Sequence, residues 1–297
     1  MKILLYNINF SNRFSTYDEL RASYVESSAV FTRDKSLFNE VDAIVFNLPH
    51  LPASKLKDHI KRKGQVWVGW NLECEKNYTS LLSDELKSLI DVWMTYHPNS
   101  DVPIPYLNAD FPERTKAAVP LPGLKDICMF VSSPVNDSRR IEYLRELMRY
   151  IRIDSYGKLF HNVDLPNDRG YKSKLEVISK YKFTIAFENA IYQDYVTEKF
   201  YEPLLAGSIP VYLGAPNIGE FSPRKNAFLN VSEFPDPKDL AAELKRLCTD
   251  EQSLKEFYRW KKEPLNDRFL EIANNQRVNP FERLINVVNS KHGLYLF

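Results

Sequence analysis

The sequence predicts an α/β protein with two Rossmann-like domains, and three observations carry this prediction. Strand-like apolar segments alternate with helix-like segments over residues 1–115. Residues 183–213 then follow the order strand, loop, helix, strand, which is a βαβ unit. Between the two regions, the Pro-rich stretch Pro112–Gly123 interrupts the alternation and is the best candidate for a linker. A chain of 297 residues is long enough for two such domains.

Residues 1–115 contain four strand candidates. Met1–Ile8 is apolar enough for a first strand and too short for a signal peptide. The other strand candidates are 43–47, 65–70 and 92–96, and polar segments with helical periodicity lie between them at 53–63 and 81–89. This pattern indicates one domain over residues 1–115.

The second region restarts the alternation after the linker. We expect a strand at 127–131, a helix at 138–151 with Ser138 as its N-cap, and a strand at 151–156. Further on, Asp236 and Pro237 form a good helix start. These elements predict a second domain over residues 124–280.

The βαβ unit is the most informative part of the chain. Residues 183–187 are β-branched and aromatic, as in a buried parallel strand, and Ile209–Leu213 form a second apolar strand. Between them, Val196–Ala206 has helical apolar spacing, and Gly207 is a good C-terminal stop. The loop 188–195 therefore lies at the carboxyl end of a strand, where open α/β sheets bind ligands.

Charge and glycine content narrow the ligand class. The net charge of +1 gives no support for nucleic-acid binding through a broad basic field. The chain has nine glycines and no GxxxxGK[ST] loop, so backbone cradling of phosphates is not expected. The remaining route to a bound diphosphate is a helix N-terminus with fixed cations. Lys199 lies at the start of one predicted helix, and Arg139 and Arg140 lie at the start of another.

Cysteines and histidines indicate no metal or disulfide framework. Cys74, Cys128 and Cys248 are widely spaced and odd in number, which favours a reducing compartment. None of the five histidines has metal-ligand spacing, and no DxD motif lies beside the 188–195 loop, so we expect no metal site. No apolar stretch approaches the length of a membrane span, although peripheral membrane association stays open.

The run Phe183–Asn189 (FTIAFEN) followed by Asp194–Lys199 (DYVTEK) closely resembles the donor-binding motif of the α1,3/4-fucosyltransferases, inverting enzymes that use GDP-fucose. The resemblance is strong over residues 126–262 and weaker over 1–115. It implies the GT-B architecture, in which two Rossmann-like domains face each other across a cleft. Residues 1–115 would then bind the acceptor and 124–280 the donor, and the helical segment 281–297 would pack back on the first domain.

The resemblance also implies donor contacts. Lys199 matches the lysine that contacts the donor diphosphate. The matching arginine is Arg140 when counted back from Tyr143, which we prefer, and Arg139 when counted forward from Val131.

Four further positions match residues of the family around the nucleotide sugar. Glu198 corresponds to a residue that accepts hydrogen bonds from the ribose, Asn189 and Tyr195 to residues that contact the donor, and Glu188 to an acid close to the fucose. The structural alternative for Glu188 is an ion pair with Lys182 or Lys199.

An inverting transfer needs a base that deprotonates the acceptor hydroxyl. Fucosyltransferases often carry Glu-Ser-Pro after an aromatic strand, and Glu73 takes the position of that glutamate. The sequence continues with Cys-Glu, so Glu75 is a second candidate. His97 stands where the family usually has an arginine, which puts a shared role of that position in doubt.

These observations predict a fucosyltransferase that moves fucose from GDP-fucose to an N-acetylglucosamine or glucose unit of an oligosaccharide, in α1,3 or α1,4 linkage, without a required cofactor. Many animal relatives carry paired cysteines and a membrane anchor, so their absence here predicts a bacterial, cytoplasmic protein. The alternatives are another nucleotide sugar or a lipopolysaccharide acceptor, and a glycan-binding relative that has lost transfer.

Overall fold

The computed structural model describes residues 1–8, 29–51, 53–117, 125–165 and 167–293. Contacts between Cα atoms divide the chain into two compact units. The first unit consists of Met1–Ile104 and Val278–Phe297, and the second consists of Pro105–Arg277. Each unit contains one parallel β-sheet.

The sheet of the first unit has six strands in the order β2-β1-β3-β4-β5-β6. Their bounds are β1 Lys2–Leu5, β2 Val30–Thr32, β3 Ala43–Asn47, β4 Val66–Asn71, β5 Val92–Thr95 and β6 Val102–Pro103. The helices of this unit are α2 Ala53–Lys57, α3 Asp84–Leu89 and α12 Pro280–Lys291, with 3₁₀ turns at Lys35–Leu37, Leu48–His50 and Thr79–Leu82. Every residue of β4 is buried, as expected for a central parallel strand.

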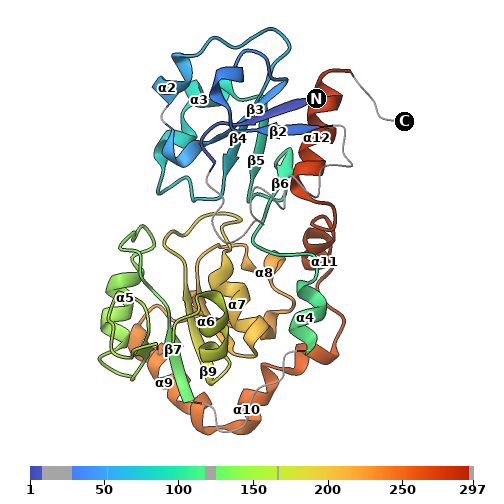
Figure 1. The fold of residues 1–297 in the computed structure, drawn as a ribbon. Helices are drawn as coiled ribbons and strands as arrows, with labels where there is room; N and C mark the ends of the chain where they lie inside the picture. Colours follow the sequence, from blue (N-terminus) through green and yellow to red (C-terminus); the bar gives the residue numbers. More distant parts are fainter. Residues whose placement is uncertain (9–28, 52, 118–124, 166, 294–297) are drawn as a thin grey trace. The chain divides into compact units, whose positions relative to one another are not determined.

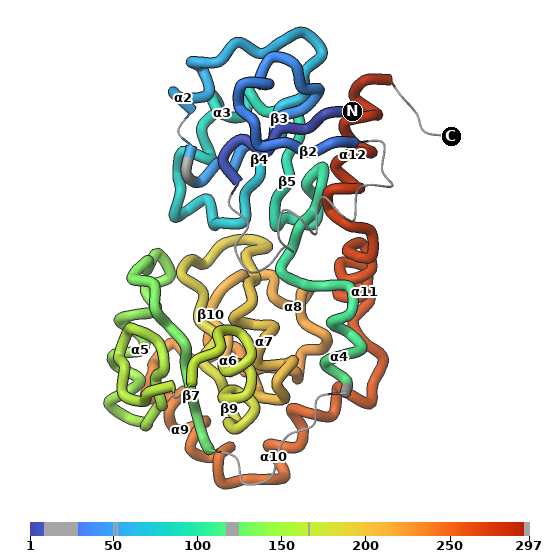
Figure 2. Tube along the Cα trace, in the orientation of Figure 1, coloured from blue at the N-terminus to red at the C-terminus, as the bar shows by residue number. Residues whose placement is uncertain are grey.

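Helices cover both faces of this sheet. The helix α12 comes from the far end of the sequence, lies beside β6 (Figures 1 and 2), and packs its Phe281 and Leu284 against the strands. On the other face, Leu56 of α2 and Leu86 of α3 pack around Trp67. The carboxyl ends of β4 and β5 are adjacent, because Asn71 is paired with Thr95.

The sheet of the second unit has five strands in the order β11-β10-β9-β7-β8. Their bounds are β7 Lys125–Met129, β8 Asp154–Ser155, β9 Tyr181–Phe187, β10 Ile209–Leu213 and β11 Leu229–Asn230. The helices are α4 Phe111–Ala117, α5 Arg140–Leu147, α6 Tyr171–Ile178, α7 Glu198–Ala206, α8 Ile218–Phe221, α9 Pro237–Thr249, α10 Glu251–Glu256 and α11 Asp267–Asn274, with 3₁₀ turns at Lys225–Ala227, Val231–Glu233 and Arg259–Lys262.

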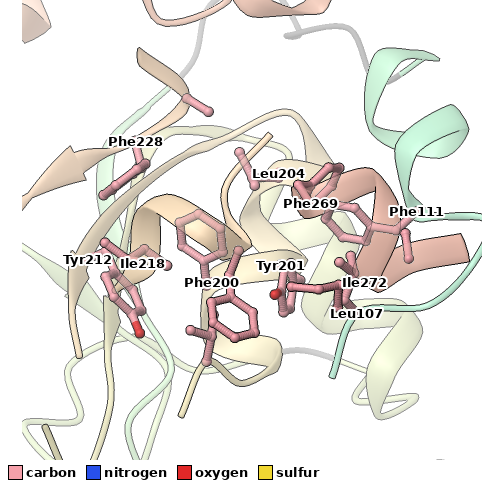
Figure 3. Packing of buried hydrophobic residues seen from close by; sticks show 14 of the residues in the cluster. Leu107, Phe111, Phe200, Tyr201, Leu204, Tyr212, Ile218, Phe228, Phe269 and Ile272 are labelled. Carbon is pink, nitrogen blue, oxygen red and sulfur yellow. The ribbon is translucent and has the colours of Figure 1, made fainter. Parts of the chain in front are cut away.

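Two apolar clusters flank this second sheet. On one face, Leu144 of α5 and Leu244 of α9 pack against strand residues such as Ile185. The other face carries α7 together with α4, α8 and α11 (Figure 1). Figure 3 shows the centre of this second cluster, where the ring of Phe200 meets Tyr212 edge to face at 5.1 Å between ring centroids. The packing fixes α7 against the strands that precede and follow it.

The βαβ unit expected from the sequence is present as β9, α7 and β10. Strands β9 and β10 are paired in parallel from Phe183 with Ile209 to Phe187 with Leu213. Thr197 is the N-cap of α7, and Gly207 ends the helix with φ 84°. This left-handed conformation suits glycine and explains why the helix ends there.

Some elements differ from the sequence-based expectation. The helix expected at 138–151 spans only Arg140–Leu147, and its N-cap is Arg139 rather than Ser138. Part of the expected linker is the helix α4, which packs against α7 and α11. The division between the units therefore falls after Ile104, because α4 belongs to the second unit.

Candidate functional site

Glu188 connects the end of β9 to the start of α7. The residue is fully buried, and both carboxylate oxygens accept hydrogen bonds from Thr197. Oε1 accepts the backbone N–H at 2.7 Å, and Oε2 accepts the hydroxyl at 2.9 Å. Figure 2 follows the chain from β9 through this loop into α7. The Glu188 carboxylate therefore holds the N-cap of α7 in place.

Lys199 lies in the first turn of α7 and is the counter-ion of this buried carboxylate. Its Nζ lies 3.3 Å from Oε2 of Glu188 and 3.3 Å from Oε1 of Glu198, and it donates to the Thr197 hydroxyl at 3.0 Å. Burial lowers the pKa of Lys199, but the two carboxylates outweigh this effect and raise the pKa above its ordinary value. With 23% of its side chain exposed, Lys199 is a fixed cation that a ligand can reach.

Arg140 joins the loop after β7 to the end of β9. The residue is 1% exposed, and one terminal nitrogen donates to the Phe187 carbonyl at 2.9 Å. The other terminal nitrogen donates to the carbonyls of Ser133 at 2.9 Å and Val135 at 3.2 Å. Its Nε is buried without a hydrogen-bond partner. The guanidinium group also interacts electrostatically with Glu188, which places it beside the β9–α7 loop.

The neighbouring residues have different surroundings. Arg139 is exposed, has a left-handed backbone with φ 57°, and acts electrostatically on Glu142 in the first turn of α5. Ser138 is not a helix cap, because its hydroxyl donates to the Glu188 carbonyl at 2.7 Å. Its N–H donates to the Asn189 carbonyl at 3.0 Å. Of the two candidate arginines, Arg140 is thus the one that the structure places beside Glu188.

The remaining donor candidates lie in the β9–α7 loop and at the start of α7. Asn189 is half-buried, Tyr195 is buried, and Glu198 is the first residue of α7. The Tyr195 carbonyl accepts a hydrogen bond from the Tyr212 hydroxyl at 3.4 Å. The sequence-predicted donor residues other than Arg139 are therefore brought to one edge of the second sheet, at the carboxyl ends of β7, β9 and β10.

Gly214 and Asn217 support this site, and the sequence analysis gave neither of them a role. A Cβ atom added at Gly214 would lie 2.3 Å from the Tyr212 hydroxyl oxygen and 2.7 Å from Cγ of Glu188, so only glycine fits there. Asn217 exchanges two hydrogen bonds with Asp194, which has a left-handed φ of 64°. The Gly-Ala-Pro-Asn sequence after β10 is the signal that could have identified this supporting turn.

The first unit carries a second polar group at the carboxyl ends of β4 and β5. Glu75 is 8% exposed, and its Oε1 accepts hydrogen bonds from Asn71 Nδ2 at 3.2 Å and from His97 Nε2 at 3.2 Å. Its Oε2 accepts the hydroxyl of Tyr96. Burial raises the pKa of the Glu75 carboxyl, but the hydrogen bonds from His97 and Tyr96 outweigh it and bring the pKa below its ordinary value.

Glu73, the other candidate base, lies in the same turn. It is half-buried, and its N–H donates to Asn71 Oδ1 at 2.8 Å. Its charge contributes to a raised pKa of Tyr78, after the larger effect of burial. The same asparagine therefore contacts the backbone of Glu73 and the carboxylate of Glu75.

In the described part of the chain, no group of three or more His, Cys, Asp or Glu side chains is arranged to hold a metal ion. Within the same residues, no helix combines the length and apolar character that crossing a bilayer requires.

Two family models match the chain. "Fucosyltransferase, N-terminal" matches residues 1–107, and "Glycosyltransferase family 10 (fucosyltransferase) C-term" matches residues 123–292. Among solved structures, an α1,3-fucosyltransferase is similar with a TM-score of 0.64 at 16% identity, over 97% of this chain and 90% of that one. A structure described as an α1,3-fucosyltransferase with GDP-fucose gives a TM-score of 0.56 at 17% identity, over 97% of this chain and 90% of that one. These similarities confirm the predicted α/β fold of the GT-B type.

Curated relatives include proteins named GDP-fucose protein O-fucosyltransferase 3. The Xenopus laevis and Homo sapiens proteins are each 32% identical over 232 residues, which is 73% of this chain and 48% and 47% of theirs. The chain thus spans about half the length of these relatives. Both are vertebrate proteins. They support neither the bacterial origin nor the cytoplasmic location that we expected from the sequence.

Proposed function

Since the chain belongs to glycosyltransferase family 10, the fucosyltransferases, we propose that it transfers fucose from GDP-fucose to a hydroxyl group. One observation carries the proposal beyond family membership. Lys199 is held as a cation at the N-terminus of α7, at the edge of the sheet where α/β proteins bind nucleotides.

The donor diphosphate would bind at the start of α7. Glycosyl transfer releases a nucleoside diphosphate, so negative charge grows on the leaving group, and a fixed cation stabilises it. Lys199 supplies this cation, and we propose Arg140 as the second one, acting through its unpartnered Nε–H and its charge. The terminal nitrogens of Arg140 donate to backbone carbonyls, so this residue also connects the loop after β7 to the end of β9.

Other parts of the donor would meet the polar groups of the same loop. Glu198 would accept hydrogen bonds from the ribose, while Asn189 and Tyr195 would contact the nucleotide sugar. Glu188 has a different role in this proposal from the one expected. Its carboxylate is fully buried under the helix start, so it would position Thr197 and Lys199 rather than contact fucose.

The names of the relatives support a proposal for the acceptor class. Because those relatives are named protein O-fucosyltransferases, we propose a side-chain hydroxyl of a protein as the acceptor. The inverting α1,3 or α1,4 transfer to N-acetylglucosamine or glucose, expected from the sequence motif, is the second candidate. In either case the first unit would bind the acceptor and the second the donor, and no metal would be required.

The reaction also needs a proton acceptor, which we propose to belong to the first unit. The carboxyl edge of its sheet carries three groups that could serve: Glu73, Glu75 and His97. Glu75 is the least suited as a direct base, since both its oxygens already accept hydrogen bonds from neighbouring side chains.

GDP release tests the proposed function. The chain would be incubated with GDP-fucose and either a mixture of unglycosylated proteins or N-acetyllactosamine, and free GDP and labelled acceptor would be measured. GDP-mannose and UDP-glucose serve as donor controls, and Lys199→Ala serves as the variant with an impaired site. Fucose on protein supports the leading proposal, and fucose on N-acetyllactosamine supports the glycan alternative. Tight GDP binding without transfer to either acceptor would refute both.

A further inference from the structure

The two cations of the proposed donor site share their surroundings with two carboxylates. Glu198 precedes Lys199 in the first turn of α7, and its Oε1 accepts a hydrogen bond from Nζ of Lys199 at 3.3 Å. Oε2 of Glu188 lies at the same distance from this nitrogen. Arg140, the second cation, interacts electrostatically with both carboxylates. The charges of these four side chains therefore sum to zero.

The ammonium group of Lys199 has its donors directed at acceptors of the protein itself. An ammonium group donates three hydrogen bonds. Nζ donates to the Thr197 hydroxyl at 3.0 Å and to Oε1 of Glu198 at 3.3 Å, and the Glu188 carboxylate is the third acceptor within reach. A phosphate oxygen that binds Lys199 must therefore replace one of these three acceptors.

Glu198 is the acceptor that a ligand can replace at the smallest cost. Glu188 is fully buried and accepts two hydrogen bonds from Thr197, so it stays beneath the helix start. Thr197 itself is 1% exposed and is the N-cap of α7. The side chain of Glu198 is 34% exposed, so a ligand can reach its carboxylate.

We propose that Glu198 makes this site selective for a nucleoside diphosphate over a diphosphate alone, because its carboxylate competes with phosphate oxygens for Lys199. The inference rests on the proposed function. It gives a specificity-determining role to a residue that was expected only to contact the ribose.

The ribose decides the outcome of this competition. Any diphosphate that approaches Lys199 weakens the contact between Lys199 and Glu198 and is repelled by the carboxylate. A nucleoside diphosphate offsets both costs, because its ribose hydroxyls donate hydrogen bonds to the charged carboxylate. Inorganic pyrophosphate has no ribose and surrounds the same carboxylate with anionic oxygens. Once Glu198 is turned to the ribose, the remaining side chains and the start of α7 present positive charge to the phosphates.

Calorimetric titration of the full chain tests the inference with three ligands at constant ionic strength: GDP, 2′,3′-dideoxy-GDP and inorganic pyrophosphate. We expect Glu198→Gln to bind pyrophosphate about 10-fold more tightly than the wild type, because the amide is uncharged and competes less well for Lys199. Dideoxy-GDP lacks the ribose hydroxyls, so its affinity should rise in the same way. GDP should bind no more tightly than to the wild type, because the variant loses the charged hydrogen bonds to the ribose.

A matched control accounts for the loss of an acid at a helix start. Glu142 is an exposed acid in the first turn of α5, where its Oε2 accepts a hydrogen bond from Asn136 at 2.7 Å. Glu142→Gln removes one negative charge as Glu198→Gln does, but this residue does not contact Lys199. It should leave the Kd values of all three ligands unchanged.

A second background locates the competition at Lys199. In Lys199→Met the disputed ammonium group is absent. Glu198→Gln added to this variant should therefore lose most of its gain in pyrophosphate affinity. A gain of the same size in both backgrounds would show that Glu198 acts by repulsion alone, which contradicts the proposal.

Two further results would overturn the inference: pyrophosphate binding that is unchanged or weaker in Glu198→Gln, or GDP and pyrophosphate affinities that rise by the same factor. The second result would show that Glu198 does not distinguish the two ligands. If the wild-type chain binds GDP and transfers fucose in these experiments, such a failure concerns Glu198 alone. If the wild-type chain neither binds GDP nor uses GDP-fucose, the proposed function fails, and the inference fails with it.

Discussion

Replacing Lys199 tests the donor site most directly, because this residue contacts a buried carboxylate and, in our proposal, the diphosphate. Lys199→Ala removes the ammonium group that lies 3.3 Å from Glu188 and 3.0 Å from the Thr197 hydroxyl. For nucleotide binding, the loss of a hydrogen bond to a charged group corresponds to about 1–3 kcal/mol, or a Kd for GDP raised about 5- to 150-fold.

The same variant should also destabilise the second unit. Removing one partner of a buried ion pair costs about 3–5 kcal/mol, because the other charge stays buried. Glu188 would keep its two hydrogen bonds from Thr197, and Lys199 is 23% exposed, so we expect the lower end of this range. For a unit of this size, about 3 kcal/mol lowers the melting temperature by about 6–12 °C.

A second variant separates the two effects. In Lys199→Met with Glu188→Gln, no charge stays buried, and the amide can still accept the N–H of Thr197. This double variant should recover most of the lost stability while its affinity for GDP stays low. Calorimetric titration with GDP and thermal unfolding measure the two quantities. An unchanged Kd for GDP in Lys199→Ala would show that this loop does not bind the diphosphate, and unchanged stability would show that the Glu188 pair contributes nothing to folding.

Three further outcomes follow from the same geometry. Gly214→Ala places a methyl group 2.3 Å from the Tyr212 hydroxyl oxygen and 2.7 Å from Cγ of Glu188. The substitution should lower the free energy of unfolding in urea by about 1–3 kcal/mol and weaken GDP binding. Gly219→Ala is the control, because the space around its Cβ position is open, and it should do neither. Transfer should persist in EDTA, because protein cations would neutralise the diphosphate; abolition by EDTA with recovery on adding manganese would contradict this. The raised pKa of Lys199 means that its contribution to stability is fully present below the ordinary lysine pKa of about 10.4 and is lost at higher pH. Unfolding measured from about pH 7 to 11 should therefore show a smaller alkaline decrease in Lys199→Met than in the wild type.

The sequence predicted the central strands and the βαβ unit because their signals are local. Residues 183–187 form a continuous apolar run, and Gly207 is the residue type that a left-handed helix end requires. The expected N-cap at Ser138 was wrong because a tertiary contact decides the conformation there. The Ser138 hydroxyl donates to the Glu188 carbonyl, 50 residues away in the chain, and no local pattern reports such a partner.

The candidate site was predictable in its residues but not in their arrangement. The motif places Glu188 at the end of a strand and Lys199 at the start of the next helix, yet it does not show that the carboxylate lies beneath the helix start. An ion pair with Lys182 or Lys199 was the structural alternative for Glu188, and the structure contains the pair with Lys199. Lys182 instead pairs with Asp126, because β9 lies next to β7.

The contacts of Glu188 affect the order of the whole proposed donor site. Its carboxylate holds α7, its carbonyl accepts from Ser138 in the loop after β7, and its N–H donates to the Leu213 carbonyl at the end of β10 at 2.7 Å. One residue thus immobilises all three segments that surround the proposed donor site. The conformational entropy of these segments is lost during folding, so a nucleotide would enter a preorganised site and keep more of its contact energy as affinity.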